Sequence, residues 1–249
     1  LFYGTIVNSA YGIAMQVSGA VQFVSISIVN AMNPQIMKAE GAGERQKMIR
    51  LCAYESKYAF LLLAMVVIPL IAEMETILHV WLREVPVHAV MFCRFILIAA
   101  LCDQISIGWT SANQAIGKIR TYSIIFYTLK LLVVLIAWWC LQEGLPIISV
   151  MWGYVAIEFI GSFVRLPLMK HIANIPIIPF FKNVFLRIIG PLATMVVVCY
   201  SSAILIDIPY RLIITFSCSL VVGVLSIWGF ALNIEEKQYV KNIIKKLKK

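Results

Sequence analysis

Residues 122–141 read YSIIFYTLKLLVVLIAWWCL, a run of twenty residues in which Lys130 is the only charge. A helix rises about 1.5 Å per residue, so this run is long enough to cross the hydrocarbon layer of a bilayer, which is about 30 Å thick. Similar apolar runs recur along the chain. Windows of about 19 residues predict about seven membrane spans, at 5–32, 56–73, 88–112, 122–141, 147–169, 188–206 and 211–232. We therefore expect an all-α polytopic membrane protein.

The composition supports this class. The chain is 61% hydrophobic and 13% charged, whereas ordinary globular domains are roughly 45–50% apolar and about 25% charged. A soluble enzyme is therefore excluded. The cysteines are scattered, without CxxC spacing or a pairing framework, and we interpret them as small apolar packing residues. They are Cys52, Cys93, Cys102, Cys140, Cys199 and Cys218.

The net charge of +9, from 21 Lys and Arg against 12 Asp and Glu, could indicate a nucleic-acid partner. The positions of the positive charges favour a membrane instead, because they alternate between connections. The connections 33–55, 113–121 and 170–187 and the C-terminal tail are rich in Lys and Arg, whereas 74–87, 142–146 and 207–210 are poor. Since Lys and Arg are retained on the cytoplasmic side, we expect a periplasmic N-terminus, a cytoplasmic C-terminus and no nucleic-acid partner.

Two segments between the spans are predicted to lie at the membrane surface. Residues 74–87 are too short and mixed to cross, and Trp81 suits the outer interface. Residues 172–185, broken by Pro176 and Pro179, are expected at the inner interface.

We divide the chain into a transmembrane bundle, 1–232, and a basic cytoplasmic tail, 233–249. The tail ends IEEKQYVKNIIKKLKK, with apolar residues spaced between lysines. It is either an amphipathic helix on an anionic leaflet or a solvated tail that only fixes orientation.

The first span carries a polar stripe. At about 100° per residue, five side chains fall within an arc of about 100°; they are Asn8, Tyr11, Ser18, Gln22 and Ser25. One hypothesis is that they line a hydrated cavity for a polar substrate. The alternative is that they form hydrogen bonds between packed helices, which the polar residues Ser9, Gln16 and Ser27 on the opposite face favour.

Ionisable residues lie inside three later spans. They are Arg94, Asp103, Lys130, Glu158 and Arg165. Each is unfavourable by about 2.5–3.5 kcal/mol at a helix centre, so each needs a partner or water. Asp103 and Lys130 lie at similar depths from the inner ends of their spans, which predicts a contact between them. Arg165 is expected to extend toward the cytoplasmic interface. Arg94 and Glu158 remain as candidates for a functional charge pair, or for contacts with an anionic headgroup and a coupling ion.

No catalytic motif occurs in the sequence. The stretch GAGE at 41–44 lacks the GK[ST] that completes a phosphate-binding loop, and HExxH, CxxC and a nucleophile elbow are absent. The three histidines are far apart, which argues against a metal site. We therefore expect no enzymatic activity, no catalytic residue, no metal and no cofactor, and transport is the default interpretation of buried charge in such a protein.

Four stretches carry a family resemblance. They are VNSAYGIAMQV (7–17), NAMNPQIMKA (30–39), ILHVWLREVP (77–86) and QAIGKIRTY (114–122). In this order they resemble the C-terminal half of bacterial lipopolysaccharide and O-antigen biosynthesis proteins, which are oligosaccharide flippases of the multidrug/oligosaccharidyl-lipid/polysaccharide exporter superfamily. The likeness covers roughly residues 1–125, and beyond them only the hydropathy pattern agrees.

The resemblance implies two lobes, commonly about fourteen helices, around a cavity that opens alternately to either side. This chain would be most of the C-terminal lobe, and the N-terminal lobe of the same protein would be missing. The implied substrate is an undecaprenyl-pyrophosphate-linked oligosaccharide, which crosses the bacterial inner membrane for O-antigen, capsule or exopolysaccharide synthesis. Membrane lipids, a polymerase and other polysaccharide-assembly proteins are the implied partners.

Within that framework the stripe Asn8, Tyr11, Ser18, Gln22 and Ser25 would contact sugar. Arg94 and Lys130 would contact pyrophosphate, and Asp103 and Glu158 would couple transport to H⁺ or Na⁺. These assignments rest on burial and on no family motif. The alternatives are a multidrug or cation antiporter of the same superfamily, a membrane-embedded glycosyl- or acyltransferase, and a membrane subunit without transport activity.

Overall fold

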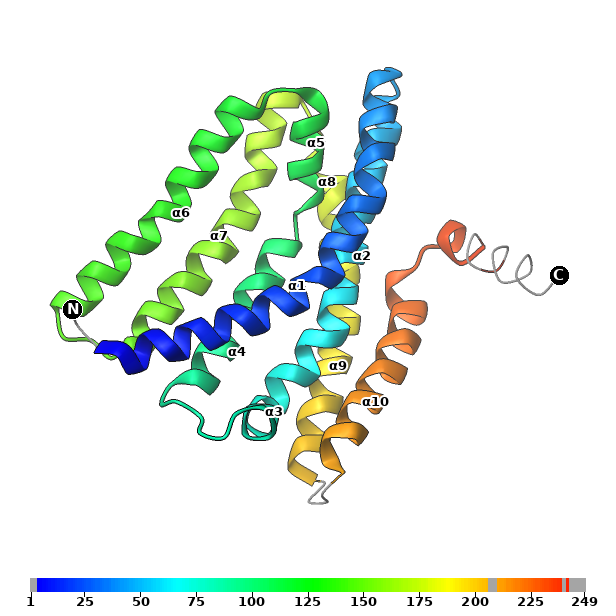
Figure 1. Ribbon diagram of the computed structural model, residues 1–249. Coiled ribbons are helices and arrows are strands. Elements are labelled where there is room, and N and C mark those ends of the chain that lie inside the picture. The colour runs from blue at the N-terminus through cyan, green and yellow to red at the C-terminus, as the bar shows by residue number, and fades with distance from the viewer. Residues whose placement is uncertain (1–3, 206–209, 239–240, 242–249) are drawn as a thin grey trace.

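The computed structural model describes residues 4–205, 210–238 and 241, and every regular element within them is helical (Figure 1). The α-helices are α1 Gly4–Gly41, α2 Arg45–Ala72, α3 Met74–Trp81, α4 Ala89–Gln104, α5 Gly108–Ile116, α6 Ile119–Gln142, α7 Ile147–Ala173, α8 Ile177–Phe180, α9 Leu186–Leu205 and α10 Arg211–Ser226. Two π-helical segments, η1 Phe181–Phe185 and η2 Ile227–Ala231, extend α8 and α10. The predicted all-α class is confirmed.

Six helices are long and apolar enough to cross a membrane, or seven if α4 and α5, bent by 47°, form one broken span. The protein is therefore a multi-pass membrane protein, and each of the seven predicted spans contains a helix. Residues 172–185 were predicted to lie at the inner interface, apart from the spans. The structure differs, because residues 177–185 continue into α9 as one helix of 29 residues, Ile177–Leu205. Pro179 permits this because it falls in the first turn, where a backbone N–H has no helical acceptor to lose.

The helices form two groups joined by α1 (Figure 1). Helices α4 to α7 form one group and α2, α9 and α10 the other, and α2 also contacts α4 and α5. Helix α1 crosses the front of the first group, bends in its middle and continues along α2 (Figure 1). Within α1, Ser25 and Ser27 donate to the carbonyl oxygens of Gln22 and Phe23; such bonds back to the helix favour bending.

Two apolar clusters hold the bundle together. One, with Leu63, Leu97 and Met195, lies between α2, α4 and α9, and the other, with Trp109 and Phe180, lies near the start of α2. Large apolar side chains elsewhere face outward, above all on α6, as expected where lipid is the solvent. All six cysteines are free, as predicted.

Helix α5 approaches α2 closely at Gly108. A Cβ there would lie 2.0 Å from the Cys52 carbonyl oxygen, and the Gly108 N–H donates to Ser56 Oγ at 2.9 Å. We expect Gly108→Ala to destabilise the protein by about 3 kcal/mol or more, because backbone must move. Thermal unfolding in detergent measures this, with Gly12→Ala, which meets no atom within 4 Å, as the control. Equal melting temperatures for the two variants would contradict the close approach.

The predicted tail is described only in part. Residues 234–238 are helical, and Glu236 is buried against α2. Tyr239, Val240 and residues 242–249, on which the amphipathic pattern depends, lie outside the described residues. The membrane-bound tail therefore stays a prediction.

Candidate functional site

A polar cavity of about 190 Å³ lies between α1, α4, α6 and α7. Its lining residues are Met15, Ser18, Gln22, Ile96, Ala99, Ala100, Asp103, Gln104, Lys130, Tyr154 and Glu158. The volume is below the roughly 300–1,000 Å³ of pockets that enclose a whole small ligand. It suits an ion, water or a fragment of a larger headgroup.

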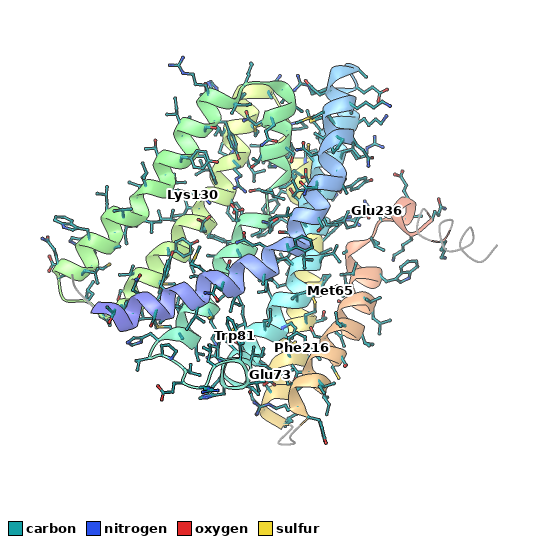
Figure 2. All side chains as sticks on the ribbon, in the orientation of Figure 1. Met65, Glu73, Trp81, Lys130, Phe216 and Glu236 are labelled. Carbon is teal, nitrogen blue, oxygen red and sulfur yellow. The ribbon has the colours of Figure 1, made fainter. Side chains whose placement is uncertain are left out.

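Four charged side chains form one network beside this cavity. Lys130 Nζ lies 3.0 Å from Glu158 Oε2 and 3.7 Å from Asp103 Oδ1, and Figure 2 shows Lys130 midway along α6. Arg165 Nη2 lies 2.6 Å from Asp103 Oδ1. Two cations thus balance two carboxylates, which a low-dielectric interior requires.

The break between α4 and α5 positions Asp103. Residues 105–107 interrupt the helix, so carbonyl oxygens that precede them lack regular helical donors. Side chains of α7 supply donors: Ser162 Oγ donates to the Cys102 carbonyl, and Arg165 Nη1 donates to the Asp103 carbonyl at 2.8 Å. Membrane proteins tolerate broken helices where neighbours satisfy the backbone in this way. The break and the charge network are therefore one structural unit.

The charged residues follow the sequence predictions unevenly. The Asp103–Lys130 contact is confirmed. The prediction that Arg165 extends to the interface is wrong, because its side chain is 3% exposed and the Asp103 carboxylate holds it inside. Arg94 is not brought to Glu158: its Nε–H donates to the Ile71 carbonyl oxygen at 3.1 Å, and it does not line the cavity.

The polar stripe of the first span divides into two parts. Ser18 and Gln22 line the cavity, and Gln22 Nε2 donates to Ser18 Oγ at 3.0 Å. Ser25 is buried and bonds only its own helix, at Gln22 O. Tyr11 packs edge-on against Phe92, with ring centroids 6.2 Å apart, and Asn8 is exposed. The structure thus places Asn8, Tyr11 and Ser25 outside the lining of this cavity.

Two ion pairs outside the cavity, each with a buried carboxylate, were not predicted. Arg211 donates to both oxygens of the fully buried Glu73, at 3.0 and 3.2 Å from Nε. Lys57 Nζ lies 2.5 Å from Glu236 Oε1, and Figure 2 shows Glu73 at the lower end of α2 and Glu236 beyond the upper end of α10. Depth counting could have found the first pair, since Glu73 ends one predicted span and Arg211 begins another on the same face.

Within the described part of the chain, no three His, Cys, Asp or Glu side chains lie close enough together to hold a metal. None of the family models, curated proteins or solved structures compared with this chain matches it. The findings therefore show a helical multi-pass membrane protein with six to seven candidate spans and a charged cavity.

Proposed function

We propose that this chain is the C-terminal lobe of a flippase that moves undecaprenyl-pyrophosphate-linked sugar repeat units across a bacterial inner membrane by alternating access. The observation that carries the proposal is the polar cavity with Lys130 between two carboxylates, inside helices long enough to span a bilayer. The four stretches that resemble the exporter superfamily supply the substrate class. The proposal includes no enzymatic step.

The described residues enclose the charged groups of the cavity only in part. Charged groups in spans are unfavourable unless they reach partners or water, and a sealed, neutral network would give no route for a substrate. Here the side chains of Lys130 and Asp103 are 32% and 26% exposed. These exposures support a hydrated passage in preference to a purely structural ion pair.

Lys130 is the group best suited to bind pyrophosphate. Among the residues that the structure describes, it is the only cation in the cavity lining, and an ammonium is a point charge with three donors. When the phosphate binds Lys130, Glu158 loses its ion pair, whereas Asp103 keeps Arg165. In this proposal Glu158 then takes up the coupling H⁺ or Na⁺, while Ser18 and Gln22 contact sugar hydroxyls. Arg94 has no role here because it lies outside the lining.

The exposed face of α1 supports a second lobe. Asn8 and Asn30 are exposed on it and lie about 40° apart around the helix at about 100° per residue, and amide side chains are poorly suited to lipid. On the same face a Cβ added to Gly12 or Gly19 would meet no atom within 4 Å. Small residues beside amides are typical of contacts between membrane helices. We therefore assign this face to the N-terminal lobe that the family resemblance implies.

A cation antiporter of the same superfamily is the second candidate. The observation that favours it is the cavity lining, which holds Asp103 and Glu158 against Lys130 alone. Arg165, which does not line the cavity, pairs with Asp103. The net charge that a substrate meets in the cavity therefore depends on how completely Arg165 neutralises Asp103.

A leaflet assay tests both candidates. The full-length protein is reconstituted in vesicles with a fluorescent undecaprenyl-pyrophosphate oligosaccharide, and a reductant that cannot cross the membrane quenches the outer leaflet. We expect the protein to carry inner-leaflet label outward, so that quenching approaches completion. Protected label together with proton-driven uptake of a cationic dye would favour the antiporter. Protected label without dye uptake would favour a subunit that does not transport.

A further inference from the structure

A second pocket, of about 290 Å³, lies apart from the charged cavity. It is formed by the start of α2, by Trp109 of α5, by α8 and η1, and by residues 233 and 235 at the base of the tail. Three of these segments belong to connections that the charge distribution predicts to face the cytoplasm. The pocket therefore lies where the predicted spans end and lipid headgroups begin.

Trp109 gives this pocket an unused hydrogen-bond donor. The side chain is 1% exposed and packs on Phe180, with ring centroids 4.8 Å apart. Its indole Nε1 has no acceptor among the described residues. Buried Trp N–H groups usually find a partner, and an unsatisfied one indicates a missing acceptor. The nitrogen itself is fully enclosed, so a ligand oxygen would reach and satisfy it only after the side chains around the indole shift.

The charges of the pocket indicate what the ligand carries. Arg50 and Glu235 are both exposed lining residues, and neither takes part in an ion pair within the described residues. Lys57, the third charged lining residue, is already neutralised by Glu236. The pocket thus offers one uncommitted cation, one uncommitted anion and one indole donor. A complementary ligand carries an anion, a cation and acceptor oxygens together.

We propose that this pocket binds a phospholipid whose headgroup carries both a phosphate and a primary ammonium. The phosphate pairs with Arg50 and accepts from Trp109 Nε1, and the ammonium donates to Glu235. The apolar surface of Pro176, Pro179 and Phe180 lies along the upper part of the acyl chains. Basic pockets between membrane helices on the cytoplasmic side bind anionic lipid headgroups, and this pocket differs from them in having a carboxylate, Glu235, as well as a free cation. The inference does not depend on the flippase proposal.

Native mass spectrometry of the full chain in detergent tests this site. We expect one phosphatidylethanolamine to bind about tenfold more tightly than either phosphatidylglycerol or phosphatidylcholine. Phosphatidylglycerol lacks the ammonium, and the ammonium of phosphatidylcholine has no N–H. A tenfold difference in affinity corresponds to about one charge-assisted hydrogen bond. Arg50→Gln and Trp109→Phe should each weaken the binding of phosphatidylethanolamine about tenfold. The matched control is Lys182→Gln, an exposed cation on η1 that does not line the pocket.

Glu235→Gln separates headgroup recognition from folding. This variant should still bind a lipid, but it should bind phosphatidylethanolamine no more tightly than phosphatidylglycerol. Equal retention of the three lipids by the unmodified protein would overturn the proposal, and so would unchanged binding in both Arg50→Gln and Trp109→Phe. Inorganic phosphate provides the last arm. If it displaces phosphatidylethanolamine at equal concentration, the site takes free phosphate and the lipid assignment is wrong.

Discussion

Replacement of Lys130 by alanine is expected to abolish transport of the lipid-linked oligosaccharide, lowering its rate by at least about 100-fold. Removal of one partner of a buried charge pair is unfavourable by about 2–5 kcal/mol, which is an upper bound here because the Lys130 side chain is 32% exposed. The change also deletes the only cation among the described residues that line the cavity. Glu158, with a side chain 7% exposed, loses its ion pair. The leaflet assay measures the rate.

Two controls separate transport from folding. Lys118→Ala removes an exposed lysine next to the same helix, and this variant should transport normally. Among the described residues, Lys118 bonds only the Ile172 carbonyl oxygen. Lys130→Ala combined with Glu158→Gln should restore protein level without restoring transport, because the stranded charge is gone but the phosphate ligand is still absent. Transport at the unmodified rate by Lys130→Ala would remove Lys130 from the mechanism.

Glu236→Ala is expected to give a large loss of stability. Lys57, with a side chain 1% exposed, pairs with Glu236, and Tyr58 donates to the same carboxylate at 2.9 Å. Stranding a buried charge is unfavourable by about 3–5 kcal/mol, which corresponds to about 10 °C in melting temperature for a chain of this size. Thermal unfolding in detergent without added lipid measures the shift.

The neighbouring Glu235 provides the matched control, because it is exposed and forms no ion pair within the described residues. Glu235→Ala should change stability by less than about 0.5 kcal/mol. The double variant Lys57→Met with Glu236→Leu should recover most of the loss, since apolar residues can replace a buried pair. Equal melting temperatures for Glu235→Ala and Glu236→Ala would show that the pair contributes no net stability.

The membrane spans were predictable because lipid imposes one strong rule on sequence: a helix that crosses the bilayer needs about 20 predominantly apolar residues. The predicted span 122–141 falls inside α6, which extends it by three residues at the start and one at the end. Helix ends in water obey no such rule. Hydropathy windows predict a connection at 33–55, but α1 continues to Gly41 and α2 already begins at Arg45. Charged residues in that stretch, such as Lys38, are therefore helical.

The break between α4 and α5 was not predictable by the same means. Residues 105–107 contain no proline and are apolar enough to continue a helix. What stabilises the break is remote in sequence, because Ser162 and Arg165 of α7 bond the carbonyls of Cys102 and Asp103. A pattern confined to one helix carries no information about such donors.

The charge network shows the same limit. Depth along the membrane normal is encoded in residue count, which is why the Asp103–Lys130 contact followed from the sequence. Rotation of one helix against another is not encoded in this way, so the burial of Arg165 against Asp103 and the separation of Arg94 from Glu158 required coordinates. Lys57 was overlooked because it lies at the edge of the predicted span 56–73.

Site-specific thiol labelling of the full-length protein in membranes tests most directly whether the cavity is a wet passage. Gln22→Cys lines the cavity, whereas Ala14→Cys, on the same helix, is fully buried away from it. With a membrane-impermeant thiol reagent and mass spectrometry, we expect the thiol at 22 to be modified and the thiol at 14 to be protected. If position 22 stays unmodified in the membrane and reacts only after unfolding, the interior is dry and the transport proposal is wrong.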